Sequence, residues 1–257
     1  MQKQYGLLGE HLTHSYSKQI HEALADYTYD LIPLSHEELT AFMTKKDFAA
    51  VNVTIPYKRE VIPFLDSLNE HAEKIGAVNT IVNRNGVLTG YNTDYSGFRY
   101  TIEKHGFTVT GKKVLVIGNG GAAQAVLAVL RDLNALEIVI VDIVPGEGVC
   151  TYEEALAKHT DAEVLVNTSP VGMFPKVDAQ PIDLAPFSKL TAVVDIIYNP
   201  TVTRLLAQAA SLGIPSCNGL EMLVAQAYFA CQIFLDKDIP EEKLTEVYEK
   251  ISEEISK

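Results

Sequence analysis

The feature that most constrains the fold is an apolar run that leads through a cluster of glycines into an alanine-rich run. It covers residues 113–130, KVLVIGNGGAAQAVLAVL. The β-branched start predicts a buried strand, the glycines a tight turn and the alanine-rich part a helix. Near-continuous apolar runs follow at 137–142, 162–168 and 192–199, as is typical of parallel strands buried on both faces. The alternation predicts an α/β protein with a doubly wound parallel sheet.

The first hundred residues also alternate between strand and helix patterns. Strands are expected at 4–9, 29–34, 48–55, 77–82 and 87–91. Asn85-Gly86 lies between the last two and is a strong hairpin signal. Ser35 and Glu38 form a capping-box pattern for a helix through about Met43. Pro56 suits the first turn of another helix.

These patterns predict two domains. Residues 1–106 are expected to form a substrate-binding catalytic α/β domain, and residues 107–218 a dinucleotide-binding domain. Residues 219–257 read as two amphipathic helices that pack back on the first domain.

Composition removes several classes of partner. Lys and Arg number 21 against 33 Asp and Glu, a net charge of −12, and no basic patch is concentrated anywhere. We therefore expect no nucleic-acid partner and no membrane partner. The cysteines are Cys150, Cys217 and Cys231, an odd number without metal-ligand spacing, so we expect no metal and a reducing, cytoplasmic location. The beginning of the chain lacks the pattern of a secretion signal. The sequence leaves open a monomer or a homodimer.

The glycine cluster, Gly118-Asn119-Gly120-Gly121-Ala122-Ala123, matches the dinucleotide-binding pattern G-x-G-x-x-A of a Rossmann-like fold. Glycines let backbone N–H groups approach a pyrophosphate at the positive end of the following helix. Asp142 ends the next strand, about 20 residues on, where a carboxylate usually receives a ribose 2′-hydroxyl and repels a 2′-phosphate. The alternative is a plain tight turn and a surface aspartate.

A lysine and an aspartate are candidates for proton transfer. Lys58 ends VNVTIPYK, and a helix beginning at Pro56 would place it beside a positive helix end, which disfavours its charged form. Asp94 follows another strand of the same domain. Neighbouring strand ends would bring the amine and the carboxylate together for acid–base chemistry. The alternative is a surface ion pair.

Short neutral polar residues also follow the strands of this domain, and they suit a ligand with several hydroxyl groups. They are Asn52, Thr54, Asn79, Asn92 and Thr93. His14, Ser15 and Ser17 follow the first strand. Their alternative role is a helix N-cap, with Ser17 as the cap, although donors at a helix start also bind a carboxylate.

Eight stretches together resemble one family, the shikimate dehydrogenases. In chain order they are GLLGEHLTHSYSKQIH, VNVTIPYK, GAVNTI, GYNTDYSGF, VIGNGGAAQAV, NTSPVGM, DIIYNP and NGLEMLVAQA. Members of that family reduce 3-dehydroshikimate to shikimate with NADP on the route to chorismate and the aromatic amino acids. Quinate/shikimate dehydrogenation with NAD, or a shikimate-binding regulatory protein without efficient turnover, are the alternatives.

The resemblance implies a role for particular residues. Lys58 would be the catalytic acid/base, and Asp94 would hold a substrate hydroxyl and orient the lysine. Ser15 and Ser17 would receive the substrate carboxylate. The other implied substrate contacts are Thr54, Asn79, Tyr198 and Gln226. The implied cofactor contacts are Gly118, Asn119, Gly120, Gly121 and Ala122 at the pyrophosphate, and Ile196 and Gly219 near the nicotinamide.

The chain departs from that family after the second strand of the dinucleotide-binding domain. The family usually shows Asn-Arg-Thr and then a helix, with the arginine on the 2′-phosphate of NADP. Here Asp142 is followed by IVPGE, without arginine, and the next helical pattern begins within about ten residues. A parallel crossover needs a dozen or more residues. We therefore expect the second crossover to be shortened and its helix to be missing. We also expect a weakened preference for NADP, with NAD as a possible cofactor.

Overall fold

The computed structural model describes residues 4–12 and 15–255 and divides into two units. Unit 1 contains the residues up to Gly97 together with Val224–Ile251. Unit 2 contains Phe98–Leu223 and the residues from Ser252 on. The domain limits 1–106, 107–218 and 219–257 stay a prediction.

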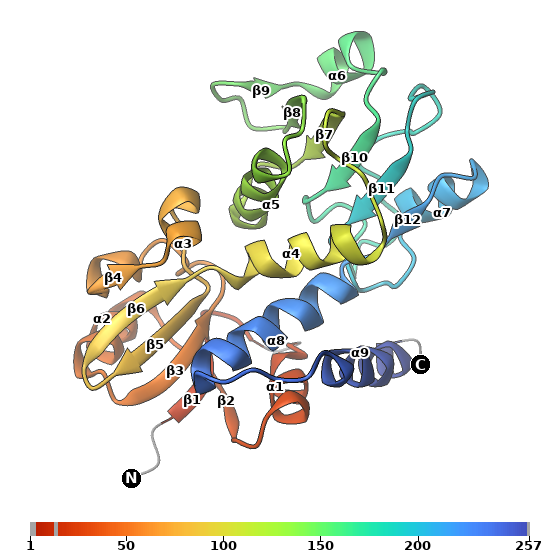
Figure 1. Cartoon of the computed structure of the whole chain (residues 1–257). Coiled ribbons are helices and arrows are strands. Elements are labelled where there is room, and N and C mark those ends of the chain that lie inside the picture. The colour runs from red at the N-terminus through yellow and green to blue at the C-terminus, as the bar shows by residue number, and fades with distance from the viewer. Residues whose placement is uncertain (1–3, 13–14, 256–257) are drawn as a thin grey trace. The chain divides into compact units, whose positions relative to one another are not determined.

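Unit 1 is built on a six-stranded mixed sheet with the strand order β2-β1-β3-β5-β6-β4 (Figure 1). The strands are β1 Gln4–Gly9, β2 Tyr29–Pro33, β3 Phe48–Val53, β4 Ser67–Leu68, β5 Thr80–Arg84 and β6 Val87–Tyr91. β1 pairs in parallel with β2 and β3, while β5 is antiparallel to β3 and β6. The parallel strands therefore end at one edge of the sheet, where their following loops lie close together.

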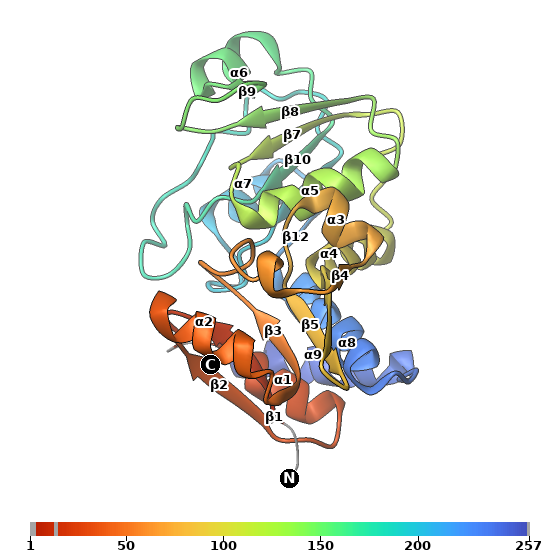
Figure 2. The ribbon, with the colours of Figure 1, turned by 90° about the vertical axis from the view of Figure 1, so that its left-hand side faces the viewer.

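Helices cover both faces of this sheet. They are α1 Ser17–Leu24, α2 His36–Lys45, α3 Glu70–Ile75, most of α8 Leu220–Leu235 and most of α9 Glu241–Ile255, while α4 Thr93–Lys104 begins in unit 1. Figure 2 shows α2 in front of the sheet and α8 behind it. Leu39 and Met43 of α2 pack with Phe48 in one apolar cluster. On the other side, His21 of α1 lies against Phe234 of α8, with ring centroids 5.7 Å apart.

Two local signals are confirmed. Ser35 accepts a hydrogen bond from the Glu38 N–H at 3.3 Å and its own N–H donates to the Glu38 carboxylate at 2.8 Å, which completes the capping box of α2. Asn85 and Gly86 join β5 to β6 with φ values of 55° and 91°. Positive φ at both positions is the conformation that a two-residue hairpin turn requires.

The helix expected to begin at Pro56 is absent. Residues 55–61 form turns, with a cis peptide bond between Ile55 and Pro56, and only a short 3-10 helix, η1 Ile62–Phe64, follows. The N–H of Val78 donates to the carbonyl of Lys58 at 2.8 Å and ties this segment to the chain before β5. The apolar residues that resemble a helical stripe, such as Val61, are instead buried by tertiary packing.

Unit 2 contains a six-stranded parallel sheet with the order β12-β11-β10-β7-β8-β9. Its strands are β7 Lys113–Ile117, β8 Glu137–Val141, β9 Val149–Cys150, β10 Val164–Asn167, β11 Ala192–Asp195 and β12 Ser216–Cys217. Its helices include α5 Gly121–Asp132, α6 Tyr152–Lys158 and α7 Arg204–Ser211. Figure 2 shows α5 in front of the sheet and α7 behind it. The doubly wound α/β fold is thus confirmed.

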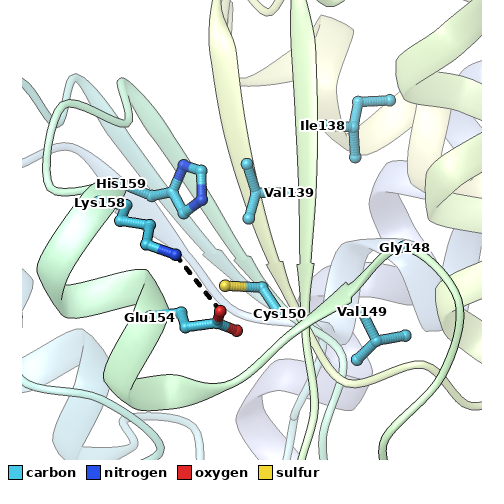
Figure 3. A pocket seen from close by; sticks show the side chains of 8 residues that line it. All are labelled: Ile138, Val139, Gly148, Val149, Cys150, Glu154, Lys158 and His159. Carbon is cyan, nitrogen blue, oxygen red and sulfur yellow. Dashed lines mark hydrogen bonds and ion pairs between the residues drawn. The ribbon is translucent and has the colours of Figure 1, made fainter.

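The second crossover of unit 2 is short, as predicted. Residues 142–148 run from β8 to β9 without a helix, and Val149 pairs in parallel with Ile140. β9 pairs with only the end of β8, so the beginning of β8 borders an open pocket of about 290 Å³ (Figure 3). Its walls include Cys150, His159 and the ion pair of Lys158 with Glu154, whose charged atoms lie 3.4 Å apart.

The described residues include no helix long and apolar enough to cross a bilayer. Within the same residues, no group of three or more His, Cys, Asp or Glu is placed to hold a metal ion. Cys150, Cys217 and Cys231 are all free thiols.

Candidate active site

The structure brings Lys58 and Asp94 together in unit 1. Lys58 lies in the turns after β3 and Asp94 in the first turn of α4, and the Lys58 ammonium donates to a carboxylate oxygen of Asp94 at 2.5 Å. The two side chains are only 17% and 13% exposed. Attraction between charges strengthens when water is largely removed from around them. This pair therefore differs from the exposed ion pairs of the surface.

The electrostatic setting of Lys58 differs from the expectation. No helix begins at Pro56, so Lys58 does not lie in the first turn of a helix. The carboxylate of Asp94, in the first turn of α4, faces the amine instead. Asp94 is the residue at a helix start, and a negative charge is stabilised there.

Asn79 and Gln226 lie around the beginning of the same helix. The amide oxygen of Asn79 accepts a hydrogen bond from the Thr93 N–H at 2.7 Å, and the Thr93 hydroxyl lies 3.5 Å from the Gln226 amide oxygen. Thr93 directly precedes Asp94. Asn79, which precedes β5, and Gln226, on α8, are therefore both connected to the element that carries Asp94.

Thr54 follows β3, and its position depends on a glycine in β1. The N–H of Thr54 donates to the carbonyl of Leu8 at 2.8 Å. A Cβ at Gly9 would lie 2.6 Å from the Thr54 methyl group. Only glycine therefore lets the threonine approach β1 this closely.

Ser15 and Ser17 form a hydroxyl pair at the beginning of α1, with their oxygen atoms 2.9 Å apart. The N–H of Ser17 also donates to the Ser15 hydroxyl at 3.2 Å. Ser17 is the first helical residue, and Tyr16 occupies the N-cap position without a side-chain cap bond. The alternative of Ser17 as the N-cap is therefore wrong. His14 lies outside the described residues.

In unit 2 the glycine turn has the form that close backbone approach requires. Gly118 has a φ of 94°, and a Cβ there would lie 2.9 Å from the Thr168 hydroxyl oxygen. Gly120 is the N-cap of α5 and makes no side-chain cap bond, and Gly121 and Ala122 form the first turn. The N–H groups of this helix start are thus suited to an anion. The residues fit a dinucleotide pyrophosphate.

Asp142 lies directly beside the glycine turn. Its carboxylate accepts hydrogen bonds from the Asn119 N–H at 2.7 Å and from the Val144 N–H at 2.9 Å. The loop 142–148 contains no Lys or Arg, and its exposed side chains include Ile143, 84% exposed, and Val144, 66% exposed. The loop therefore fits a ribose with free hydroxyls and offers no cation to a 2′-phosphate.

The two residues expected near a nicotinamide also meet in unit 2. A Cβ at Gly219 would lie 1.8 Å from the carbonyl oxygen of Ile196, so no other residue fits at that position. Tyr198 is half-buried in the same unit. Of the substrate contacts implied by the sequence, Tyr198 thus belongs to unit 2 and the others belong to unit 1.

Among the buried charged residues that sequence reasoning missed is Asp195, at the end of β11. Its carboxylate accepts from Asn167 at 3.0 Å, from the Ile197 N–H at 3.1 Å and from the Thr203 hydroxyl at 2.7 Å. Burial raises the pKa of Asp195 to about 6, although these hydrogen bonds act in the opposite direction. The network holds the backbone beside Ile196. An aspartate that directly ends a buried apolar strand is the signal that could have identified it.

Comparison with known proteins agrees with this geometry. The family model described as "Shikimate dehydrogenase substrate binding domain" matches residues 7–81. A relative from Clostridium beijerinckii, named shikimate dehydrogenase (NADP(+)), is 37% identical and covers 94% of this chain and 95% of its own. The chain belongs to the shikimate dehydrogenase family.

Solved structures support the same membership. A chorismate mutase/shikimate 5-dehydrogenase fusion protein from Clostridium acetobutylicum is 35% identical, with a TM-score of 0.93 and full coverage of both chains. Shikimate 5-dehydrogenase from Listeria monocytogenes, solved with shikimate and NAD, is 30% identical, with a TM-score of 0.85 over 96% of each chain. The family resemblance seen in the sequence is therefore confirmed.

Proposed function

We propose that this protein catalyses the reversible, NAD(P)H-dependent reduction of 3-dehydroshikimate to shikimate, a step of chorismate biosynthesis. The observation that carries the proposal is the short contact between Lys58 and Asp94, 2.5 Å in a largely buried setting. A proton donor held this way beside a carboxylate is what carbonyl reduction requires.

The reaction needs one proton and one hydride. A nicotinamide cofactor, when bound, supplies the hydride to the ketone carbon. Lys58 donates a proton from its ammonium to the ketone oxygen as that oxygen becomes an alcohol. Asp94 orients the amine and accepts a hydrogen bond from a neighbouring substrate hydroxyl. In the reverse direction the neutral amine of Lys58 takes the proton back.

The remaining polar groups of unit 1 fit the substrate's own groups. The adjacent hydroxyls of Ser15 and Ser17 are donors for the substrate carboxylate. Thr54, Asn79 and Gln226 offer neutral groups to the ring hydroxyls. From unit 2, we assign Tyr198 to the same substrate.

The cofactor would be held by unit 2. We assign Gly118, Asn119, Gly120, Gly121 and Ala122 to the pyrophosphate, Asp142 to the adenosine ribose, and Ile196 and Gly219 to the nicotinamide. The relative from Clostridium beijerinckii is named as NADP(+)-dependent. Because Asp142 is acidic and its loop has no cation, we expect a weakened preference for NADP here, with NAD as an alternative cofactor. Comparing kcat/KM for NAD and NADP tests this, and a strong NADP preference would overturn the role of Asp142.

Two alternatives are tested by the same assay. An NAD-dependent quinate/shikimate dehydrogenase would oxidise quinate at a rate comparable with shikimate. A shikimate-binding regulatory protein is favoured by one observation, the short loop 142–148. Such a protein would bind shikimate, as calorimetry would detect, without any absorbance change from reduced cofactor.

The cellular setting follows from the same proposal. Three free thiols suit a reducing compartment, so we place the protein in the cytoplasm. We propose that it works as a monomer or a homodimer.

A further inference from the structure

A chain of buried polar side chains lies behind the substrate residues of unit 1. It begins at Tyr29 on β2, whose side chain is completely buried. The Tyr29 hydroxyl donates to the amide oxygen of Asn52 at 2.7 Å. The amide nitrogen of Asn52 donates to the carbonyl of Asn79 at 3.1 Å and to the hydroxyl of Thr80 at 3.0 Å. Tyr29 is thereby connected to a proposed substrate contact on the far side of β3.

Two backbone groups fix the orientation of both side-chain amides in this chain. A carbonyl only accepts and an N–H only donates. Because Asn52 bonds to the Asn79 carbonyl, its nitrogen must face Asn79 and its oxygen must face Tyr29. Because Asn79 bonds to the Thr93 N–H, its amide oxygen must face Thr93. Neither amide can rotate by 180° without losing these bonds.

This direction determines what Asn79 offers to a ligand. Its amide oxygen also lies 2.9 Å from the Thr80 hydroxyl and 3.2 Å from the Thr93 hydroxyl, so the oxygen is fully used. In the described part of the chain, the buried side-chain nitrogen and oxygen atoms without a partner are His21 Nε2 and His159 Nδ1. The network offers no acceptor to the Asn79 amide nitrogen, so this nitrogen is left as a donor for a ligand, on a residue that is 3% exposed.

We propose that the Tyr29 hydroxyl is a positioning group for substrate binding, acting through Asn52 and Thr80 to hold the Asn79 amide with its nitrogen toward the substrate. Without the hydroxyl, the buried oxygen of Asn52 has no donor, and a buried acceptor without a partner is costly. Asn52 would then move toward another donor and release Asn79. The inference rests on the proposed function, because it concerns a substrate contact of that site.

The test compares two tyrosines of the same aromatic cluster. Tyr29→Phe removes the hydroxyl at the start of the chain and keeps the ring. Tyr27→Phe is the matched control, because the Tyr27 hydroxyl bonds to His21 at 2.8 Å and to the Cys231 thiol at 3.0 Å, outside the network. We expect Tyr29→Phe to raise KM for shikimate about tenfold, the loss of roughly one hydrogen bond, with a smaller change in kcat. Tyr27→Phe should leave KM within about twofold.

A double-mutant cycle separates positioning from a general loss of structure. In an Asn79→Ala background, Tyr29→Phe should have almost no further effect on KM, because the group that it positions is gone. The same fold-change in both backgrounds, or equal effects of the two tyrosine variants, would overturn the proposal. If Tyr29→Phe does not fold, the variants Thr80→Val and Thr80→Ser test the positioning proposal instead. Thr80→Val should raise KM for shikimate. Thr80→Ser, which keeps the hydroxyl, should leave KM close to the wild-type value.

Failure of the proposed function gives a different result. If the wild-type protein turns over shikimate with neither cofactor, the dehydrogenase proposal fails. The positioning proposal is then measured on the dissociation constant of shikimate by calorimetry, with the same variants and the same expected ratios. Wild-type turnover with no coupling between positions 29 and 79 would overturn only the positioning proposal.

Discussion

Each unit has a buried polar network beside its proposed site, and the two networks differ in charge. In unit 1 the network of Tyr29, Asn52 and Thr80 is made of neutral groups. In unit 2 the network is centred on the carboxylate of Asp195. Neutral groups do not disturb the Lys58–Asp94 pair, whose charges matter for proton transfer. Unit 2 needs no such pair, so a buried carboxylate with three donors is tolerated there.

In each unit burial disfavours the charged form of one titratable group, and the direction of the pKa shift depends on whether that form is positive or negative. Burial lowers the pKa of His21 in unit 1 to about 3, so the ring stays neutral. Its contribution to stability is present above the usual histidine pKa and is lost as the pH falls from 6.5 toward 3. Burial raises the pKa of Asp195 to about 6. That contribution is present at low pH and is lost as the pH rises through 6.

The largest expected effect is on the reactive pair of unit 1. Lys58→Ala removes the proton donor, and we expect kcat to fall by about a thousandfold or more, with the dissociation constant of shikimate changed little. Steady-state kinetics and calorimetry measure the two quantities. Lys46→Ala is the control, since it breaks an ion pair of the same unit, with Asp66 at 3.3 Å. Near-normal turnover of Lys58→Ala would remove the lysine from its role.

The next largest effect is expected when a charge is placed in the neutral network of unit 1. Asn52→Asp puts a second oxygen opposite the Asn79 carbonyl and the Thr80 hydroxyl, where the wild type has a donor. We expect the free energy of unfolding to fall by about 3 kcal/mol at pH 7. The loss should shrink toward pH 4, as the carboxyl becomes protonated. Urea unfolding at both pH values measures it. A loss that is equal at both would show that the network tolerates charge.

The converse change, Asp195→Asn, removes the carboxylate charge from the buried network of unit 2. Burial raises the pKa of Asp195 from its usual value of 3.8 to about 6, a shift equivalent to about 3 kcal/mol. The wild type should therefore lose up to that much stability, relative to Asp195→Asn, as the pH rises from 4 to 7. Urea unfolding across this range tests it. Asp178→Asn, at an exposed position, should follow the wild type, and parallel curves for all three proteins would contradict the assignment.

The smallest expected effect concerns the loop beside the glycine turn. Ile143→Arg restores a cation next to Asp142, and we expect kcat/KM for NADP to rise about tenfold relative to NAD. Leu136→Arg is the control, because it adds the same charge at an exposed position before β8. Equal changes in both variants would assign the effect to net charge and not to the loop.

Much of the fold could be predicted from local patterns. The Asn85-Gly86 hairpin, the Ser35 capping box and the glycine turn at Gly118 depend on residues close in the sequence. The short second crossover followed from chain length alone. The prediction of a helix at Pro56 was wrong because the segment is held by distant partners, such as Val78, that no local pattern reports.

The sequence by itself determined the order of strands and helices and the residue types available for chemistry, because periodicity and turn chemistry act over a few residues. Only the tertiary structure decided that Lys58 lies in a turn and not in a helix, that Asp195 is buried among three donors, and that Tyr29 is connected to Asn79. Hydrogen bonds and burial depend on groups from separate strands that meet when the sheets form, so their strength is a property of the folded chain.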